Sequence, residues 1–431
     1  MTLGVDGVTW PTAPLGRIVR IVGGGTPSKT RSDFWDGTIP WVSPKDMGAR
    51  ELHDASDHIS QAAVDGSATQ VVPAGSVLIV VRSGILIHRF PVSLARTQVA
   101  LNQDLKALLP GGPLLPEYLA YALEAKSNHV LRECVKRGAT VHSVDIGKLQ
   151  QVSLAVPPSS EQRRIVEILD HSNRLRRLRA EADTKADRIL PALFIKMFGD
   201  PWINPRSWRI DRLERIAEVQ GGLQLTPKRA ENPLDVPYLR VANVHRGRLD
   251  LSEIKRLPVT EQEFHRTRLH PGDILVVEGH GNPEEIGRSA IWDGSVDPCV
   301  HQNHLIRVRV APDRATPEFV SAFLNSASGR QHLLRAGKTT SGLNTISVTN
   351  VQRVEILAPP LGLQRAFSSR VMNHAQNHGN RQLAASALER LWALVVGRAF
   401  SGNLTAAWRT AHMKELLPEM EHQAKTMGGV T

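Results

Sequence analysis

The hydrophobic and polar positions of this chain form two kinds of segment, and each kind occurs twice. Residues 77–81 (VLIVV) and 274–277 (ILVV) are rich in β-branched side chains and follow turns that contain proline and glycine. Such short apolar runs predict buried strands. Residues 116–131 and 317–334 carry apolar side chains at helical spacing, with a proline near the first turn, and predict helices.

The paired segments belong to one long internal repeat. Its matching pairs are IPWV at 39–42 with VPYL at 236–239, PAGSVLIVV at 73–81 with PGDILVV at 271–277, NQDL at 102–105 with NHLI at 303–306, PEYLAYAL at 116–123 with PEFVSAFL at 317–324, and VSLAVPP at 152–158 with VEILAPP at 354–360. The shift between partners stays at about 200 residues in every pair, which chance rarely produces. The chain therefore predicts two related domains.

A long helix is expected after each domain, where two adjacent prolines end a strand. The first helix, over residues 159–198, opens with SSEQ, which is typical of an N-cap and a capping box. We expect its one internal proline, Pro191, to kink it, and its length to be on the order of 55 Å. The second helix, over residues 361–402, has Leu363 in place of Glu161, so its predicted capping is weaker.

Heptad spacing predicts that the two helices pack side by side and antiparallel. In the first helix the predicted contact positions are Ile168, Leu175, Ala182 and Ile189, flanked by Leu178 and Leu193. In the second they are Phe367, Val371, His374, His378, Arg381, Ala385, Leu388, Trp392, Val395 and Ala399. The alternative is that each helix packs on its own domain alone.

These patterns predict a mixed α/β (α+β) fold with two pseudo-symmetric domains, separated by two long, antiparallel, coiled-coil-like helices. The domains cover residues 1–158 and 199–360, and the helices cover residues 159–198 and 361–402. The tail, residues 403–431, is expected either to extend the last helix or to fray.

Composition narrows the functional classes. The net charge is +11 and the isoelectric point is about 10.0, which favours a polyanionic partner such as nucleic acid. The two cysteines, Cys134 and Cys299, are too few for a disulfide framework and are expected to be buried. No signal peptide or membrane-spanning run is recognisable, so a cytoplasmic location is expected.

Motifs for nucleotide and nucleic-acid chemistry are missing. A P-loop ending at Gly337 would need a glycine five residues earlier, where the chain has His332. Glu124 and Lys126 lie on a predicted helix and lack the acidic strand residue of a nuclease site. No methyltransferase, dinucleotide or zinc-protease motif is found, so no catalytic, cofactor or metal residue is predicted.

Several motifs, in order along the chain, resemble those of type I restriction–modification DNA specificity subunits. They are GGGTPSK at 23–29, FWDGTIPW at 34–41 with Asp46 and Met47, PPSSEQRRI at 157–165, FIKMFGDP at 194–201, and AFSGNL at 399–404 with Trp408 and Arg409. The second copy departs from the pattern by an insertion in its glycine-rich loop, residues 221–228. The resemblance covers about residues 12–410.

The resemblance implies a non-catalytic subunit that reads a bipartite site in double-stranded DNA, with one target-recognition domain per half. The helices would act as a spacer. The expected partners are two modification subunits, which carry S-adenosylmethionine and methylate adenine, and restriction subunits with a motor and a nuclease, so that S-adenosylmethionine, ATP and Mg²⁺ are expected on the partners and no cofactor on this chain. The alternatives are a methylation-only specificity subunit, a divergent enzyme, and a helical scaffold that binds proteins only.

The candidate DNA contacts come from loops that recur in both copies. Glycine, hydroxyl and basic residues suit phosphate contact, while Arg and Asn can read guanine and adenine. The candidates are Gly24, Thr26, Lys29, Lys45, Lys136, Arg137 and His142 in the first copy, and Thr226, Lys228, Arg240, Asn243, Lys338 and Asn344 in the second. Of these, Arg240 and Asn243 are the predicted base readers. The alternative for each residue is a tight turn or an ordinary polar surface position.

Overall fold

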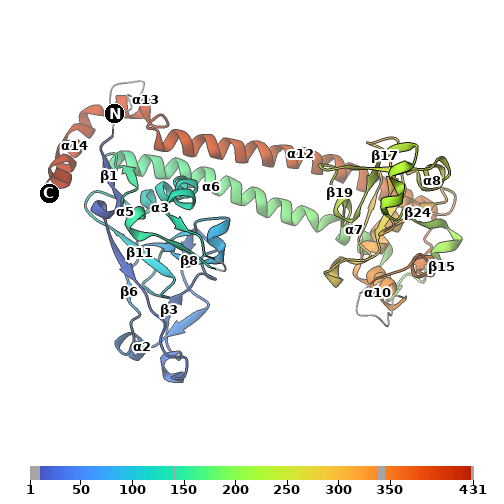
Figure 1. Cartoon of the computed structure of the whole chain (residues 1–431), viewed down its shortest axis with the longest axis horizontal. Coiled ribbons are helices and arrows are strands. Elements are labelled where there is room, and N and C mark those ends of the chain that lie inside the picture. The colour runs from blue at the N-terminus through green and yellow to red at the C-terminus, as the bar shows by residue number, and fades with distance from the viewer. Residues whose placement is uncertain (1–9, 139–140, 337–344, 429–431) are drawn as a thin grey trace. The chain divides into compact units, whose positions relative to one another are not determined.

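The computed structural model describes residues 10–138, 141–336 and 345–428 (Figure 1). The chain divides into two compact units. The first unit comprises residues 1–179 and 385–431, and the second comprises residues 180–384. Each unit contains one copy of the sequence repeat.

Two main sheets form the first unit. The larger has the strand order β2 (Val19–Gly23), β11 (Leu105–Pro110), β7 (Val77–Val80), β9 (Val92–Ala95) and β4 (Glu51–Leu52). The other has the order β5 (Asp57–Ile59), β3 (Ile39–Val42), β10 (Val99–Leu101) and β6 (Val71–Val72). Smaller sheets pair β12 (Val135–Lys136), β13 (His142–Val144) and β8 (Arg82–Ser83), and β1 (Thr12–Pro14) with β14 (Ser153–Ala155). All four residues of β7 are buried, as its β-branched sequence predicts.

The second unit repeats most of this topology, with one strand fewer in each main sheet. Its sheets have the orders β16 (Ala217–Gly221), β24 (Leu305–Val310), β21 (Ile274–Val277), β22 (Ser289–Ile291), and β20 (Lys255–Val259), β17 (Leu234–Leu239), β23 (Val300–His301). Two strand pairs complete it, β15 (Ile210–Arg212) with β25 (Glu355–Leu357) and β18 (Val244–His245) with β19 (Arg248–Leu249). Both units contain an equivalent parallel pair, β3 with β10 and β17 with β23. The first unit has a second parallel pair, β4 with β9. The mixed α/β fold and the repeat are thus confirmed.

The helices of the two units also correspond. In the first unit they are α1 (Leu15–Ile18), α2 (Gln61–Asp65), α3 (Pro116–Ala125), α4 (Ser127–His129) and α5 (Ile146–Gln150). In the second they are α8 (Glu261–Thr267), α9 (Pro317–Asn325), α10 (Ala327–Ala336) and α11 (Val348–Gln352). The two helices predicted after the repeated PE motifs are each broken, at Lys126 and at Ser326. The Ser326 hydroxyl donates to the Phe323 carbonyl and accepts from the Gly329 amide, which ends one helix and starts the next.

The first long helix is interrupted once. It consists of α6 (Ser159–Asp187) and α7 (Ile189–Phe198), with Arg188 between them. Pro191 has no N–H to donate to the carbonyl four residues earlier, which is that of Asp187. The helix is therefore interrupted at this carbonyl, where the sequence predicted a kink. The second long helix, α12 (Leu361–Phe400), is continuous over 40 residues.

Contacts between the long helices occur in both units, and in the second they have antiparallel order. In the first unit the Arg176 guanidinium bonds the Glu389 carboxylate at 2.7 and 2.9 Å. In the second unit Asp183 pairs with Arg381 at 3.6 Å, and the His374 ring bonds the Ala186 carbonyl at 3.2 Å. From the first of these two second-unit contacts to the other, the residue number rises in α6 and falls in α12, as in an antiparallel pair.

The seam of α12 is formed by the predicted positions, all of which are buried or half-buried. The predicted seam of the first long helix is wrong at Leu175, Ala182 and Ile189, which are exposed, whereas Ile168 is half-buried as predicted. Leu175 and Ile189 are 46% and 52% exposed, whereas the positions that follow each of them, Arg176 and Leu190, are half-buried. The buried and half-buried residues on this face of α6 and α7 include Ile165, Leu169, Ser172, Arg176, Arg179, Asp183, Ala186, Leu190 and Met197.

The predicted capping box at the start of α6 is also wrong. Glu161 is fully buried, and Gln162 is buried behind it. The Gln162 amide accepts from the Leu115 amide at 2.9 Å and donates to the carbonyls of Pro113 and Pro157. Gln364 does the same at the start of α12, where it accepts from Thr316 N at 3.0 Å and donates to a proline carbonyl. Both glutamines tie a long helix to its own domain.

Two further helices form the C-terminal tail, which neither extends α12 nor frays over its described length. After Gly402 (φ 82°), α13 (Ala406–Ala411) and α14 (Met413–Gly428) pack on the first unit. The Gln423 amide donates to the Val156 carbonyl at 2.6 Å, and the Glu419 carboxylate accepts from the Ser160 amide at 3.0 Å. The tail thus supplies the cap that Glu161 does not.

Both cysteines are buried, as expected. Among the described residues, no helix has the length and apolar character needed to cross a membrane.

Candidate nucleic-acid interface

Several loops of the first unit meet at one edge of its sheets. Gly23, at the end of β2, lies opposite Lys106, and Val80, at the end of β7, lies opposite Leu105. The neighbouring sheet ends at the same place, because the Asn102 amide donates to the Val42 carbonyl at 2.9 Å. We call the loops that leave these strands, residues 24–29, 43–46, 81–90 and 102–104, the first-unit edge.

The second unit has an equivalent edge. Gly221 lies opposite Ile306, and Val277 lies opposite Leu305. The Gln302 amide donates to the Leu239 carbonyl at 2.9 Å, as Asn102 does to Val42. We call residues 222–228, 240–243, 278–288 and 302–304 the second-unit edge.

A glycine begins each edge for a packing reason. A β-carbon on Gly24 would overlap the backbone carbonyls of Leu101 and Asn102, and one on Gly222 would overlap those of His301 and Gln302. Only glycine lets the two loops pass this close. Gly24, predicted as a DNA contact, therefore has a structural role in shaping the loop.

The other predicted residues of this loop are exposed. The Thr26 hydroxyl bonds the Gln103 side-chain carbonyl, so the loop and the turn at residues 102–104 support each other. Lys29 is exposed in the same loop. Lys45, after β3, bonds Asp57 at 2.9 Å, and this hydrogen bond raises the pKa of its ammonium group.

Lys136, Arg137 and His142 come together beside the first-unit edge. β12 and β8 flank β13, so that Lys136 lies opposite Ser143 and His142 opposite Ser83. Lys136 pairs with Asp145 at 2.9 Å, and the hydrogen bond from Lys136 is the main cause of the lowered pKa of that carboxyl. Arg137 is exposed and His142 is half-buried.

In the second unit Thr226 and Lys228 are exposed, at the start of the short 3-10 helix η5 (Pro227–Glu231). Arg240 pairs with Glu253 at 2.6 Å and is only 22% exposed. Reading a guanine with Arg240 would therefore require that this ion pair break first. Lys338 and Asn344 lie outside the described residues.

The prediction that Asn243 reads a base is wrong. Its side chain is 3% exposed. Its Oδ1 accepts from the Arg240 amide at 3.0 Å, and its Nδ2 donates to the carbonyls of Asp250 and Glu253 at 2.8 and 2.9 Å. The amide closes the turn after β17 and has no group left for a base.

Two positions in each edge were missed by the sequence analysis. In the first unit Gln103 and Arg82 are exposed, and Arg82 lies 3.9 Å from Asp104. In the second unit Gln302 is half-buried, and His304 is 55% exposed and 3.2 Å from Glu278. The recurrence of the motif at residues 102–105 was a usable signal, but only the fold shows that its polar members point outward.

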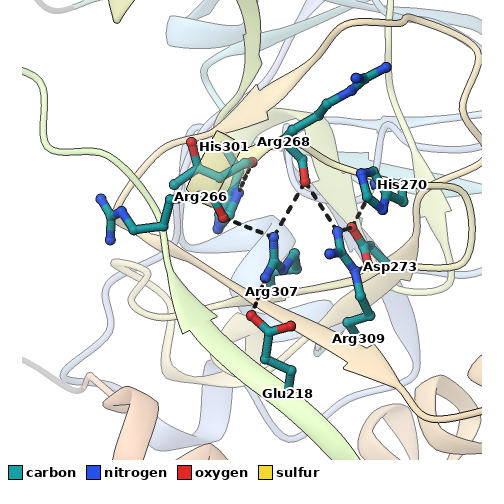
Figure 2. Close-up of polar contacts among 9 residues, drawn as sticks. Glu218, Arg266, Arg268, His270, Asp273, His301, Arg307 and Arg309 are labelled. Atoms are coloured by element: carbon teal, nitrogen blue, oxygen red, sulfur yellow. Dashed lines mark hydrogen bonds and ion pairs between the residues drawn. The ribbon is translucent and has the colours of Figure 1, made fainter. Parts of the chain in front are cut away.

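A buried polar network lies behind the second-unit edge (Figure 2). Arg307 is 2% exposed, bonds Glu218 at 2.6 Å and donates to the carbonyls of Arg266 and Arg268. Arg309 forms a two-pronged ion pair with the buried Asp273, both contacts at 2.7 Å. The first unit has Ala107 and Leu109 on the equivalent strand, so this network distinguishes the two units.

His301 completes the network at the end of β23. Its imidazole is fully buried and bonds the Thr267 carbonyl at 3.2 Å. Burial, and secondarily the nearby Arg307 guanidinium, lowers its pKa from 6.5 to about 4. The ring is therefore neutral near pH 7 and serves to hold the edge strands rather than to bind phosphate.

Within the described ranges, no group of three or more His, Cys, Asp or Glu side chains is placed to hold a metal ion.

Comparison with known proteins finds one family. Residues 7–182 match the type I restriction modification DNA specificity domain. The chain is 44% identical over 164 residues to the EcoR124I/EcoR124II specificity subunit of Escherichia coli, which is 38% of this chain and 40% of the relative. It is 29% identical over 302 residues to the EcoKI specificity subunit of Escherichia coli K12, which is 63% of this chain and 62% of the relative. The chain thus spans less than two thirds of either relative.

The fold also has a solved counterpart. A chain in a structure that concerns the assembly and conformational transition of the type I R-M system has a TM-score of 0.59 and 16% identity, over 92% of this chain and 98% of that chain. At this identity the likeness concerns the fold alone.

Proposed function

Since the chain belongs to the family of type I restriction–modification specificity subunits, we propose that it is the non-catalytic subunit that recognises a bipartite sequence in double-stranded DNA. One observation carries the proposal. The same edge, with the same obligatory glycine at Gly24 and Gly222, occurs in both units and presents exposed polar and basic side chains. Two related readers address two segments of duplex.

Each edge combines the two kinds of group that DNA recognition needs. Lys29 and Lys228 are exposed, flexible cations suited to phosphate oxygens, which position a protein on the duplex. Gln103 and Gln302 carry amides, which can bond the adenine edge in the major groove. We assign base reading to the turns at residues 102–104 and 302–304, in place of Asn243.

The partners that we propose are modification subunits, two per chain, and restriction subunits. S-adenosylmethionine, ATP and Mg²⁺ would be held by those subunits. We propose that a modification subunit docks on exposed leucines of the first unit. These are Leu175 and Leu178 on α6, and Leu391 and Leu394 on α12, all 46% to 64% exposed. In an antiparallel pair with the observed seams, Leu175 and Leu391 fall on the same side. Such an exposed apolar stripe marks an interaction site.

The decisive experiment compares adenine methylation across the host genome with and without this gene, by single-molecule sequencing. We expect methylation of one bipartite motif with a fixed spacer to disappear with the gene. Unchanged methylation, together with no binding of duplex DNA by the purified chain, would refute the proposal and leave the protein-binding scaffold. Restriction of unmethylated phage DNA by the same strains separates a full system from a methylation-only one.

A further inference from the structure

A short turn at the first-unit edge presents apolar side chains among cations. The 3-10 helix η2 (Gly84–Ile87) follows β8, and its Ile87 is 59% exposed. Val141, which is 43% exposed, directly precedes β13, and β13 contacts η2. The basic side chains of the neighbouring segments are all exposed, and they are Arg82, His88, Arg89 and Arg137.

The turn holds Ile87 rigidly. Leu86 and Phe90, on either side, are 2% and 4% exposed and fix the segment in the core. The amides of His88 and Arg89 both donate to the Ile85 carbonyl at 3.0 Å, and the Ser83 hydroxyl accepts from the Ile85 amide at 3.3 Å. Because Leu86 and Phe90 already fill the neighbouring core positions, the Ile87 side chain cannot become buried in the core.

The second unit has no such tip at the equivalent place. Its loop between β21 and β22 contains η7 (Pro283–Glu285), and the following Ile286 is only 1% exposed. Glu284 and Glu285 are occupied by ion pairs, Glu285 with Arg288 at 2.8 Å. Among the described residues, the exposed apolar tip and its basic neighbours therefore occur in the first unit and not at the equivalent loop of the second.

We propose that Ile87 is a wedge that enters between adjacent base pairs of the half-site read by the first unit, while Arg82 and Arg89 contact the phosphates on either side. Aliphatic wedges unstack one base step and kink the duplex, and the cost is offset by additional backbone contacts. The cations select a polyanion over a neutral protein surface, and the rigid turn avoids an ordering cost. The inference rests on the proposed function and adds deformation of one half-site to it.

The test uses the full-length chain in complex with its modification subunits, and duplexes that carry the motif found by methylation mapping. 2-Aminopurine is placed in turn at each position of both half-sites. The adenines that the modification subunits methylate are left unsubstituted, because methyltransferases flip their target base out of the stack. At the remaining positions we expect a rise in fluorescence at one step of one half-site with the wild-type complex, because an unstacked 2-aminopurine is no longer quenched. Ile87→Ala abolishes this rise and weakens binding about tenfold, since it removes most of the inserted apolar group. Ile87→Leu retains both properties.

Ile203→Ala is the matched control, because Ile203 is 72% exposed and is not among the residues of either edge. It leaves fluorescence and affinity unchanged. An unchanged rise in Ile87→Ala, or no rise at any step with the wild type, overturns the wedge while binding and methylation still support the proposed function. Loss of a modification subunit from Ile87→Ala on gel filtration also overturns it, because Ile87 would then be a protein contact. Failure of the wild-type complex to bind the mapped duplex refutes the proposed function itself.

Discussion

Glu161 and Arg409 form a buried ion pair in the first unit, although 248 positions separate them in the sequence. Arg409 Nη2 lies 2.8 Å from Glu161 Oε1, and the two side chains are 9% and 0% exposed. The same carboxylate accepts from the indole N–H of Trp10 at 2.9 Å and from the Thr405 hydroxyl at 2.6 Å. Residues near both ends of the chain are therefore tied to the start of α6.

Removing one partner of this pair should destabilise the first unit strongly. Arg409→Ala leaves the Glu161 carboxylate buried without its cation, so we expect the free energy of unfolding to fall by about 3–5 kcal/mol. Denaturant titration of the full chain measures this. The control is Arg398→Ala, an exposed arginine on α12, with an expected change within about 0.5 kcal/mol. Equal stability of the two variants would mean that the tail does not hold the first unit together.

The packing role of Gly24 predicts a cost for a single methyl group. Gly24→Ala should lower the free energy of unfolding by about 1–3 kcal/mol, because the β-carbon overlaps two backbone carbonyls. Gly48→Ala is the matched control, since no atom lies within 4 Å of its β-carbon. Thermal unfolding of both variants measures the difference. If Gly24→Ala is as stable as wild type but binds DNA less well, Gly24 is a direct contact after all.

The burial of His301 predicts that the second unit becomes less stable to unfolding at acid pH. Its folded pKa of about 4 lies below the unfolded value of 6.5, so between these values the unfolded chain binds a proton that the folded chain excludes. Stability from this histidine is complete above pH 6.5 and is lost as pH falls through 4, by about 3 kcal/mol. His301→Leu, which copies Leu101 of the first unit, should remove this contribution. Between pH 7 and pH 4 the melting temperature of the wild type should fall more than that of the variant. Parallel curves would contradict the assignment.

We expect the exposed Lys29 to contact a DNA phosphate, whatever the base sequence. Lys29→Ala should weaken binding to all duplexes similarly and reduce the slope of log affinity against log salt by about one. Binding of a fluorescent duplex at several salt concentrations gives the slope. Lys196→Ala, an exposed lysine on α7, should leave it unchanged. A change confined to one base pair of the target would instead make Lys29 a base reader.

The apolar stripe predicts where a modification subunit docks. Leu391→Asp should weaken the complex with that subunit by at least about tenfold, because it places a charge in a surface that must lose its water. Co-purification and gel filtration detect the loss. Leu417→Asp, on α14 and 50% exposed, is the control and should not alter assembly. Retained assembly with Leu391→Asp would move the docking surface elsewhere.

The sequence by itself determined the repeat, the mixed fold, the start of both long helices and the seam of α12. These depend on local periodicity and on comparison of the chain with itself, which require no knowledge of burial. Family resemblance supplied the expected function from motifs spread over the same segments.

The tertiary structure decided what periodicity leaves ambiguous. On α6, two neighbouring heptad series both look suitable, and only packing against α12 shows that the polar series at Arg176 and Asp183 is inside while Leu175 is outside. Asn243 and Glu161 look like surface groups until long-range partners bury them, and Ile87 looks like a core residue until its neighbours fill the core. A side chain's burial depends on segments far away in sequence, and a local pattern contains no information about them.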